Sequence, residues 1–170
     1  MLQQTPQREL LAIPQGVTTL VATMSWDLPG VIQPEPWALA YNKDGVINGQ
    51  HANTHFRSTY GGVITLDRNQ PTAYIDLAKL IQQHPEAGGI SLIANLYSGP
   101  QSRATFSGLS KASVEIGSLQ YQQITPIARH DIDLATTDLG VFFLPLASIV
   151  RELDGSWSLA GGWCPLRYGS

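Results

Sequence analysis

The stretch Thr18-Thr-Leu-Val-Ala-Thr-Met-Ser-Trp-Asp27 and the later stretch Leu146-Ala-Ser-Ile-Val-Arg-Glu-Leu-Asp-Gly-Ser-Trp-Ser-Leu-Ala160 decide the fold class of this chain. In both, apolar and polar side chains alternate, and a Trp stands beside a polar turn. The first stretch places four apolar side chains on one face: Leu20, Ala22, Met24 and Trp26. A period of two residues is typical of a strand that buries one face. The two segments therefore predict an all-β protein.

Turn-forming residues divide the rest of the chain into short segments. The 16 glycines and 11 prolines are spread along the sequence, as expected for short strands joined by turns. Asn42-Lys-Asp-Gly45 and Asp154-Gly155 predict tight turns, because Asp-Gly tolerates positive φ. Together with the strand at Leu20, about eight short strands are predicted, among them 37–41, 63–66, 90–96, 114–116, a weaker one at 121–127, 140–150 and 156–160.

One short helix interrupts the strands. Asp76 is a suitable N-cap, Leu77, Leu80 and Ile81 follow at helical spacing, and Pro85 ends the segment. Short strands with a single helix predict a two-sheet antiparallel β-sandwich, with a barrel or an α+β fold as alternatives. At 170 residues the chain is expected to form one domain, residues 1–170, with its core at about 10–162.

Composition and charge exclude several classes of function. Only 14% of the residues are charged, the net charge is −3, and no run of Lys or Arg is present, so nucleic-acid binding is not expected. Cys164 is the only cysteine, so no internal disulfide can form. The start of the chain lacks the profile of a secretion signal, and the longest apolar run, Val141 to Val150, is interrupted by Pro145. We expect a cytoplasmic protein without a transmembrane segment.

Two groups of residues could carry chemistry. His51 and His55 have the spacing of a helical zinc site, but their polar surroundings favour a solvated loop. His130, Asp131, Asp133 and Asp138 form a small acidic cluster, in which Asp131 and Asp133 would share one face of a strand. This cluster is a candidate hard-cation site or the centre of a hydrolase, whereas a charged loop before a strand is the simpler interpretation. No nucleophile elbow or phosphate-binding loop is present, so no catalytic residue is predicted.

The four tryptophans suggest a different kind of site. Trp26 and Trp157 fall on apolar strand faces and are predicted to lie in the core. Trp37 and Trp163 are candidates for exposed positions, where they would contact a protein partner. An exposed Trp platform would instead favour a sugar-binding sandwich.

Six motifs occur in a fixed order over residues 10 to 162. They are Ala22–Asp27, Ile32–Tyr41, Leu66–Asn69, Ile75-Asp-Leu-Ala-Lys-Leu80, Phe106–Val114, and the closing pair Ile149-Val-Arg151 and Gly155–Leu159. In the order and spacing of these motifs the chain resembles the TerD family, bacterial proteins of tellurite resistance and stress response. The common order and spacing of the motifs, rather than any single one, carry the resemblance. The resemblance implies a two-sheet β-sandwich, in agreement with the periodicity.

The resemblance also implies calcium binding through acidic loops, and here the chain departs from the family. Gln33 and Glu35 stand where the family has two aspartates, and the family's acidic run is missing between Asn69 and Thr72. Calcium usually takes six to eight oxygen ligands.

Three carboxylates remain as metal ligands implied by the resemblance: Asp27, Glu35 and Asp67. The resemblance therefore predicts that calcium binding is weakened or lost, so that the cofactor is either absent or Ca²⁺. We predict a non-enzymatic, TerD-like binding or scaffolding module that acts in tellurite resistance or stress response through a protein partner or a second copy of itself. A working calcium-binding module, a hydrolase at His130 and a sugar-binding sandwich are the alternatives.

Overall fold

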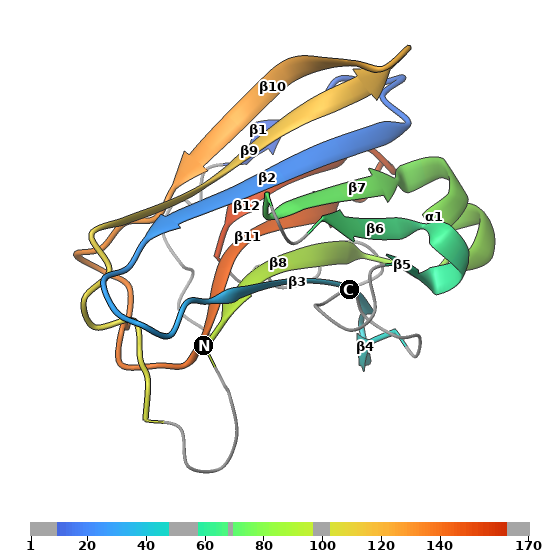
Figure 1. Ribbon diagram of the computed structural model, residues 1–170. Helices are drawn as coiled ribbons and strands as arrows, with labels where there is room; N and C mark the ends of the chain where they lie inside the picture. Colours follow the sequence, from blue (N-terminus) through green and yellow to red (C-terminus); the bar gives the residue numbers. More distant parts are fainter. Residues whose placement is uncertain (1–9, 48–57, 68–69, 97–102, 163–170) are drawn as a thin grey trace.

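Two six-stranded sheets pack face to face in the computed structural model of the protein, which describes residues 10–47, 58–67, 70–96 and 103–162 (Figure 1). All strand pairs are antiparallel. Sheet A has the order β1-β12-β11-β8-β3-β4, with β1 at Leu11–Ala12, β12 at Trp157–Gly161, β11 at Phe143–Arg151, β8 at Gly89–Asn95, β3 at Glu35–Asn42 and β4 at Gly45–Val46.

The second sheet, sheet B, contains the hairpin β9–β10. Its order is β10-β9-β2-β7-β6-β5, with β10 at Gln123–Asp131, β9 at Lys111–Gln120, β2 at Thr19–Asp27, β7 at Thr72–Asp76, β6 at Ile64–Asp67 and β5 at Ser58–Thr59. A short 3₁₀ helix, η1, covers Tyr60–Gly62, and the helix α1 covers Leu77–Gln83. The predicted all-β sandwich with one short helix is confirmed. The described part has twelve strands rather than about eight. Three of them, β1, β4 and β5, are only two residues long, which is too short for a clear alternating pattern in the sequence.

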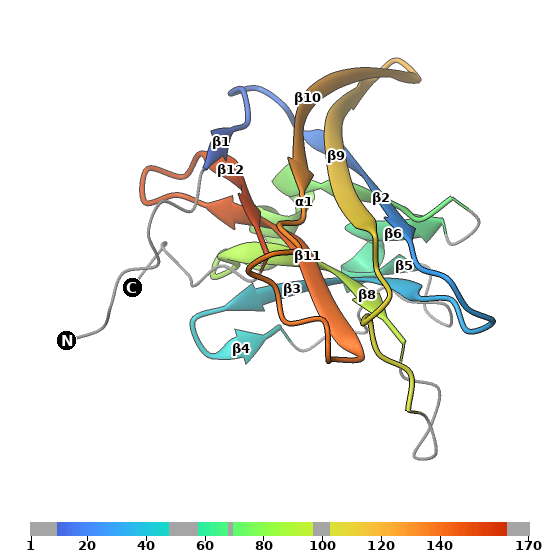
Figure 2. The ribbon, with the colours of Figure 1, turned by 90° about the vertical axis from the view of Figure 1, so that its left-hand side faces the viewer.

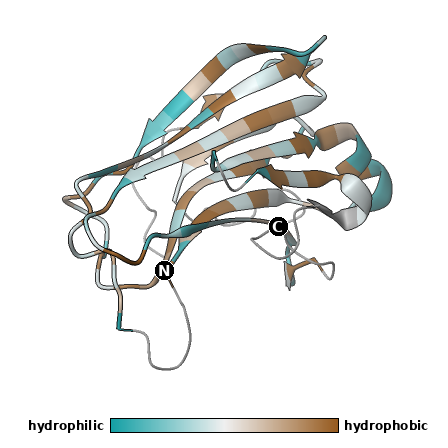
Figure 3. Ribbon diagram, viewed as in Figure 1, coloured by the Kyte–Doolittle hydropathy of each residue, from teal (hydrophilic) through white to brown (hydrophobic). Residues whose placement is uncertain are grey.

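The core lies between the two sheets, and hydrophobic residues recur along the strands of both (Figures 2 and 3). Leu20 and Met24 of β2 face Ile90 and Leu92 of β8 across this interior, and all four are at most 1% exposed. Burial of these side chains is the main favourable term in folding. Trp26 and Trp157 pack against the same core as partly buried side chains, as predicted.

The local signals that the sequence carries most clearly have formed as predicted. Asp76 caps α1 by accepting a hydrogen bond from the backbone N–H of Lys79 at 2.9 Å. The turn after Asn42 joins β3 to β4, and Gly155, at φ 87°, lies in the turn between β11 and β12. None of the helices that the structure describes is long and apolar enough to cross a membrane.

The hairpin β9–β10 differs from the prediction of a short strand near 114–116 and a weak one at 121–127. Both strands are longer, at ten and nine residues, and they meet at a two-residue turn formed by Tyr121 and Gln122. These two residues have φ of 52° and 62°. Turns of this kind are usually signalled by Asn-Gly or Asp-Gly. Because the chain has Tyr-Gln at this position, no turn could be predicted there.

The outer faces of the two sheets differ in polarity. On sheet A, Leu39, Tyr41 and Ile93 form an apolar cluster outside the main core, and each is at most 6% exposed. On sheet B, the outward-facing side chains of Thr23, Ser25 and Glu115 are exposed. Sheet A is thus buried on both faces, whereas sheet B presents a polar face to its surroundings.

Candidate functional site

The three predicted calcium ligands lie at the ends of three strands. Asp27 ends β2 and Asp67 ends β6, both in sheet B, and Glu35 begins β3 in sheet A. The register places Asp67 opposite Thr72, and Thr72 opposite Thr23. Asp67 is therefore four residues along and two strands across from Asp27, so their Cα atoms are about 17 Å apart.

A calcium ion holds its oxygen ligands at about 2.3–2.6 Å, so Asp27 and Asp67 are too far apart at their backbones for a compact site. Within the described residues, no three His, Cys, Asp or Glu side chains are grouped so that they would hold a metal ion. Calcium binding at Asp27, Glu35 and Asp67 stays a prediction.

The candidate hydrolase residues do not converge. His130 and Asp131 are neighbours on β10, and alternation turns their side chains to opposite faces of sheet B. The ring of His130 lies over Gly161 of β12, where an added Cβ would clash with it. The prediction that Asp131 and Asp133 share one face of a strand is wrong, because β10 ends at Asp131. The Oδ1 of Asp133 instead accepts a hydrogen bond from the backbone N–H of Ala135 at 3.0 Å.

The tryptophan positions give a mixed result. Trp37 is half-buried on the outer face of sheet A, where its ring meets that of Phe143 edge to face at 5.5 Å between centroids. Trp163, together with His51 and His55, lies outside the described residues. A role of Trp37 or Trp163 in binding a partner stays a prediction.

A groove of about 380 Å³ crosses the outer face of sheet B, and the sequence did not point to it. Its floor is formed by Val21 of β2 and Gly117 of β9, and its wall by Ile124 and Pro126 of β10. Arg129 lines one end of the groove. The volume lies within the range of small-ligand pockets, about 300 to 1,000 Å³.

Gly117 is the reason that the groove can form. A Cβ at this position would lie 2.8 Å from both Ile124 Cγ2 and the carbonyl oxygen of Thr125, so β10 approaches β9 too closely for any side chain. Just beyond this contact, the register between β9 and β10 shifts between Pro126 and Ala128, which marks a β-bulge. Bulges bend a strand and redirect its side chains.

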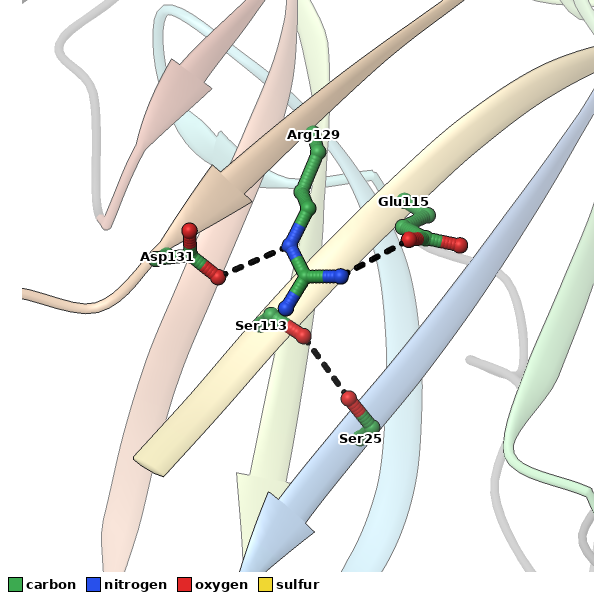
Figure 4. A network of polar contacts seen from close by, with 5 residues as sticks. All are labelled: Ser25, Ser113, Glu115, Arg129 and Asp131. Atoms are coloured by element: carbon green, nitrogen blue, oxygen red, sulfur yellow. Dashed lines mark hydrogen bonds and ion pairs between the residues drawn. The ribbon is translucent and has the colours of Figure 1, made fainter. Parts of the chain in front are cut away.

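At the end of the groove, Arg129 forms an ion-pair cluster with two carboxylates (Figure 4). Its Nη1 donates to Glu115 Oε1 and its Nε donates to Asp131 Oδ1, both at 2.9 Å. The hydrogen bond with Asp131 is the main cause, and that with Glu115 the second, of a raised pKa of Arg129. The guanidinium therefore stays charged at every physiological pH. More than half of each of the three side chains is exposed, and the cluster is open to a ligand.

A second hollow of about 320 Å³ lies on the other side of this cluster and shares Arg129 and Asp131 with it. Its lining includes the hydroxyls of Ser25 and Ser113, which are hydrogen-bonded to each other at 2.7 Å. The two hollows therefore follow β9 from Gly117 to Lys111, and each combines apolar and polar lining residues. Chemically, the arrangement can bind a molecule that presents both apolar and polar groups.

The sequence carried two weak signals for this site. Gly117 interrupts the alternation of β9, and a glycine inside a strand often marks a bulge or a close approach of backbone. Arg129 and Asp131 stand two apart, the spacing of neighbours on one face of a strand.

The fold is shared with known structures at low sequence identity. The sequence matches no protein-family model and no curated protein. A homologue of the telluride resistance protein TerD from Streptomyces coelicolor A3(2) superposes with a TM-score of 0.58 at 16% identity, over 87% of this chain and 90% of that one. A protein of unknown function gives a TM-score of 0.57 at 15% identity, over 92% of each chain. The predicted resemblance to TerD is thereby confirmed at the level of the fold.

Proposed function

We propose that this protein is a non-enzymatic, TerD-like binding module of a bacterial tellurite-resistance or stress-response system, in which calcium binding is weakened to the point of loss, and that it binds a partner at the groove on sheet B. The observation that carries the proposal is the contrast between the two outer faces. Sheet A is buried on both sides, whereas sheet B combines an open groove with exposed charges. Grooves with an apolar floor and a few fixed polar groups are typical of binding sites.

Two further observations support the proposal. The fold is that of a TerD homologue, which makes the same broad role a reasonable analogy, although fold alone does not fix function. In addition, alternation along β10 separates His130 from Asp131, the pair that a hydrolase would use, so we assign no catalytic step to this region. A cytoplasmic location is part of the proposal.

The experiment that tests this function places a photo-crosslinking amino acid in the groove, at Thr23, and at a matched exposed position away from it, at Leu153. In living cells of the host bacterium we expect a discrete protein adduct from position 23 and none from position 153. Deletion of the gene is expected to lower survival on tellurite or under oxidative stress, and the wild-type gene to restore it. Equal adducts at both positions, or unchanged survival, would contradict the proposal.

A further inference from the structure

We propose that the partner on the outer face of sheet B is a second copy of this chain, packed face to face so that the two β9 strands run antiparallel. The inference rests on the proposed function and names the partner that it requires. The two-fold axis lies in the interface, runs across the strands, and follows the row of Ser25, Ser113 and Asp131 (Figure 4).

Three rows of polar side chains cross the outer face of sheet B. Successive rows are two residues apart along the strands, because every second side chain points to the same face. Residues of one row lie side by side on β2, β9 and β10. The register gives the rows as Thr23, Glu115 and Arg129, then Ser25, Ser113 and Asp131, then Asp27 and Lys111.

Along β9 the charge of the outward side chains changes sign about the middle row. Lys111 and Glu115 stand two residues to either side of Ser113. A two-fold axis through the middle row therefore brings the ammonium group of Lys111 in each copy over the carboxylate of Glu115 in the other. The same rotation brings the hydroxyl of Thr23 over the carboxylate of Asp27, to which it can donate a hydrogen bond. The face is complementary to itself.

Both members of the ion pair between copies have capacity for it. Lys111 is exposed, and within the part of the chain that the structure describes it forms no ion pair, although Asp27 lies beside it in the register. Arg129 bonds to Oε1 of Glu115, so Oε2 remains as an acceptor. More than half of the Glu115 side chain is exposed. An ammonium group can therefore approach Glu115 from outside the sheet without displacing Arg129.

The ion pair of Arg129 and Asp131 lies next to the axis and is compatible with the dimer. Its two members are bonded at 2.9 Å, and together they carry no net charge. Rotation about the axis turns the pair of one copy antiparallel to the pair of the other, which is a favourable arrangement of two dipoles. Each guanidinium then faces the Asp131 carboxylates of both copies, and this offsets the repulsion between those carboxylates.

The size of the face indicates a weak dimer. Three strands about 4.8 Å apart and about nine residues long form a face of roughly 14 Å by 30 Å, on the order of 400 Å² per copy. Interfaces of this size are typical of weak association. The covered area also includes the groove, where Ile124 is 55% exposed, so the dimer removes apolar surface from water as well as pairing charges.

The test is sedimentation equilibrium of the purified chain at concentrations up to about 1 mM. We expect a monomer–dimer equilibrium that weakens in 1 M salt. Glu115→Lys and Lys111→Glu each set like charges against each other in both ion pairs, so each variant alone is expected to dimerise on the order of tenfold more weakly. In an equimolar mixture of the two variants both pairs again have opposite signs, and we expect a heterodimer about as tight as the wild-type dimer.

Controls separate this face from the rest of the surface. Glu86→Lys and Lys43→Glu make the same changes of charge at exposed positions of two turns, and they are expected to leave dimerisation unchanged. With the only cysteine removed by Cys164→Ser, Ser25→Cys places a thiol next to the axis. A short bismaleimide is expected to join two such chains, whereas Leu153→Cys, at a position that is 70% exposed, gives no crosslink. Circular dichroism checks that each variant is folded.

Three results would overturn the inference: no dimer at any concentration tested, a mixture of the two variants that associates no better than either alone, or equal crosslinking from positions 25 and 153. The adduct from position 23 in cells is expected to have twice the mass of the chain. If position 23 instead crosslinks only to a different protein, the binding module stands and this inference fails. If the purified chain dimerises through this face but deletion of the gene leaves survival unchanged, the dimer stands and the proposed function fails.

Discussion

The outer faces of the two sheets carry side chains of opposite character although the sheets have the same number of strands. On sheet A the central positions hold Leu39, Tyr41, Ser91 and Ile93, and none of them is more than 6% exposed. On sheet B the corresponding area holds exposed hydroxyls, a groove and the Arg129 cluster.

This difference indicates that the outer face of sheet A contributes to stability and that of sheet B to binding. An antiparallel sheet commonly buries one face and exposes the other, and sheet B follows that pattern. Sheet A does not, and its strand β8 is buried along its whole length. We infer that changes on the outer face of sheet A act on the free energy of unfolding, whereas changes on the outer face of sheet B act on binding. The following predictions test that division.

The largest effect is expected from a charge placed on each outer face. Ser91→Asp puts a carboxylate at a fully buried position of sheet A, and an uncompensated buried charge is expected to cost about 4 kcal/mol or more. Ser25→Asp makes the same change at an exposed position of sheet B and is expected to alter stability by less than about 0.5 kcal/mol. Urea unfolding measures both, and similar losses would remove the distinction between the faces.

A matched pair of isoleucines gives the next largest effect. Ile93→Ala on sheet A is expected to lower the free energy of unfolding by about 2–5 kcal/mol, because Ile93 is 1% exposed and its loss leaves a cavity. Ile124→Ala on sheet B removes a side chain that is 55% exposed, so we expect a change within about 0.5 kcal/mol together with weaker binding of the partner. A large destabilisation by Ile124→Ala would contradict the assignment of this face to binding.

Gly117 is the position on the outer face of sheet B where a substitution is expected to destabilise the protein, as it would in a packed core. Gly117→Ala brings a Cβ to 2.8 Å from the carbonyl oxygen of Thr125, which is backbone and cannot rotate away. We expect a loss of about 1–3 kcal/mol, as for other overpacked sites. Gly108→Ala is the control, because its nearest contact would be at 3.7 Å, and it is expected to change little. Equal stability of the two variants would show that β10 moves freely over β9.

A smaller effect is expected from the turn between β11 and β12 of sheet A. Hydrogen bonds from the hydroxyl and then the backbone N–H of Ser156 lower the pKa of Asp154 below its ordinary value of 3.8. Because the folded-state pKa is the lower one, the stabilisation is present above about pH 4 and is lost as the pH falls through the folded value. Asp154→Asn is therefore expected to destabilise the protein at pH 7 and to differ less from the wild type at pH 3.

Ser156→Ala provides a second check, since it removes one of the two bonds and is expected to act in the same direction by a smaller amount. Unfolding in urea across this pH range measures both variants. A pH dependence identical to that of the wild type in both would show that the turn makes no such contribution.

The smallest effect, none, is expected from calcium. A site formed by Asp27, Glu35 and Asp67 would have to join sheet B to sheet A. We expect the melting temperature in EDTA to equal that in about 10 mM calcium, a concentration above that needed by weak sites. A rise of several degrees that Asp27→Asn and Asp67→Asn abolish would contradict the expectation and would restore calcium to the function.

Much of the fold could be predicted from the sequence because its signals are local. The cap at Asp76 and the turns at Asn42 and Asp154 depend on a few neighbouring residues, and all three formed as predicted. The turn at Tyr121 and Gln122 was missed because neither residue favours positive φ. There the pairing of two long strands determines the turn.

The groove could not be predicted, because it depends on register. Arg129 lies opposite Glu115 only because the bulge between Pro126 and Ala128 shifts the pairing by one residue. A shift of one residue moves every later side chain to the other face. Without the bulge, Arg129 would point into the sandwich. Pro126 in β10 is compatible with either an edge strand or a bulge, so it does not fix the register.

The position of β1 at the edge of sheet A has a consequence for synthesis on the ribosome. Leu11 pairs with Leu159, so sheet A is complete only after nearly all of the described chain has been translated. β8 also waits for a partner, since 47 residues separate Asn95 from Phe143, the start of β11. At about 5–20 residues per second this interval lasts roughly 2 to 10 s. During this interval the nascent chain carries a strand that the folded protein buries along its whole length, with one edge unpaired, while β9 and β10 are already being made.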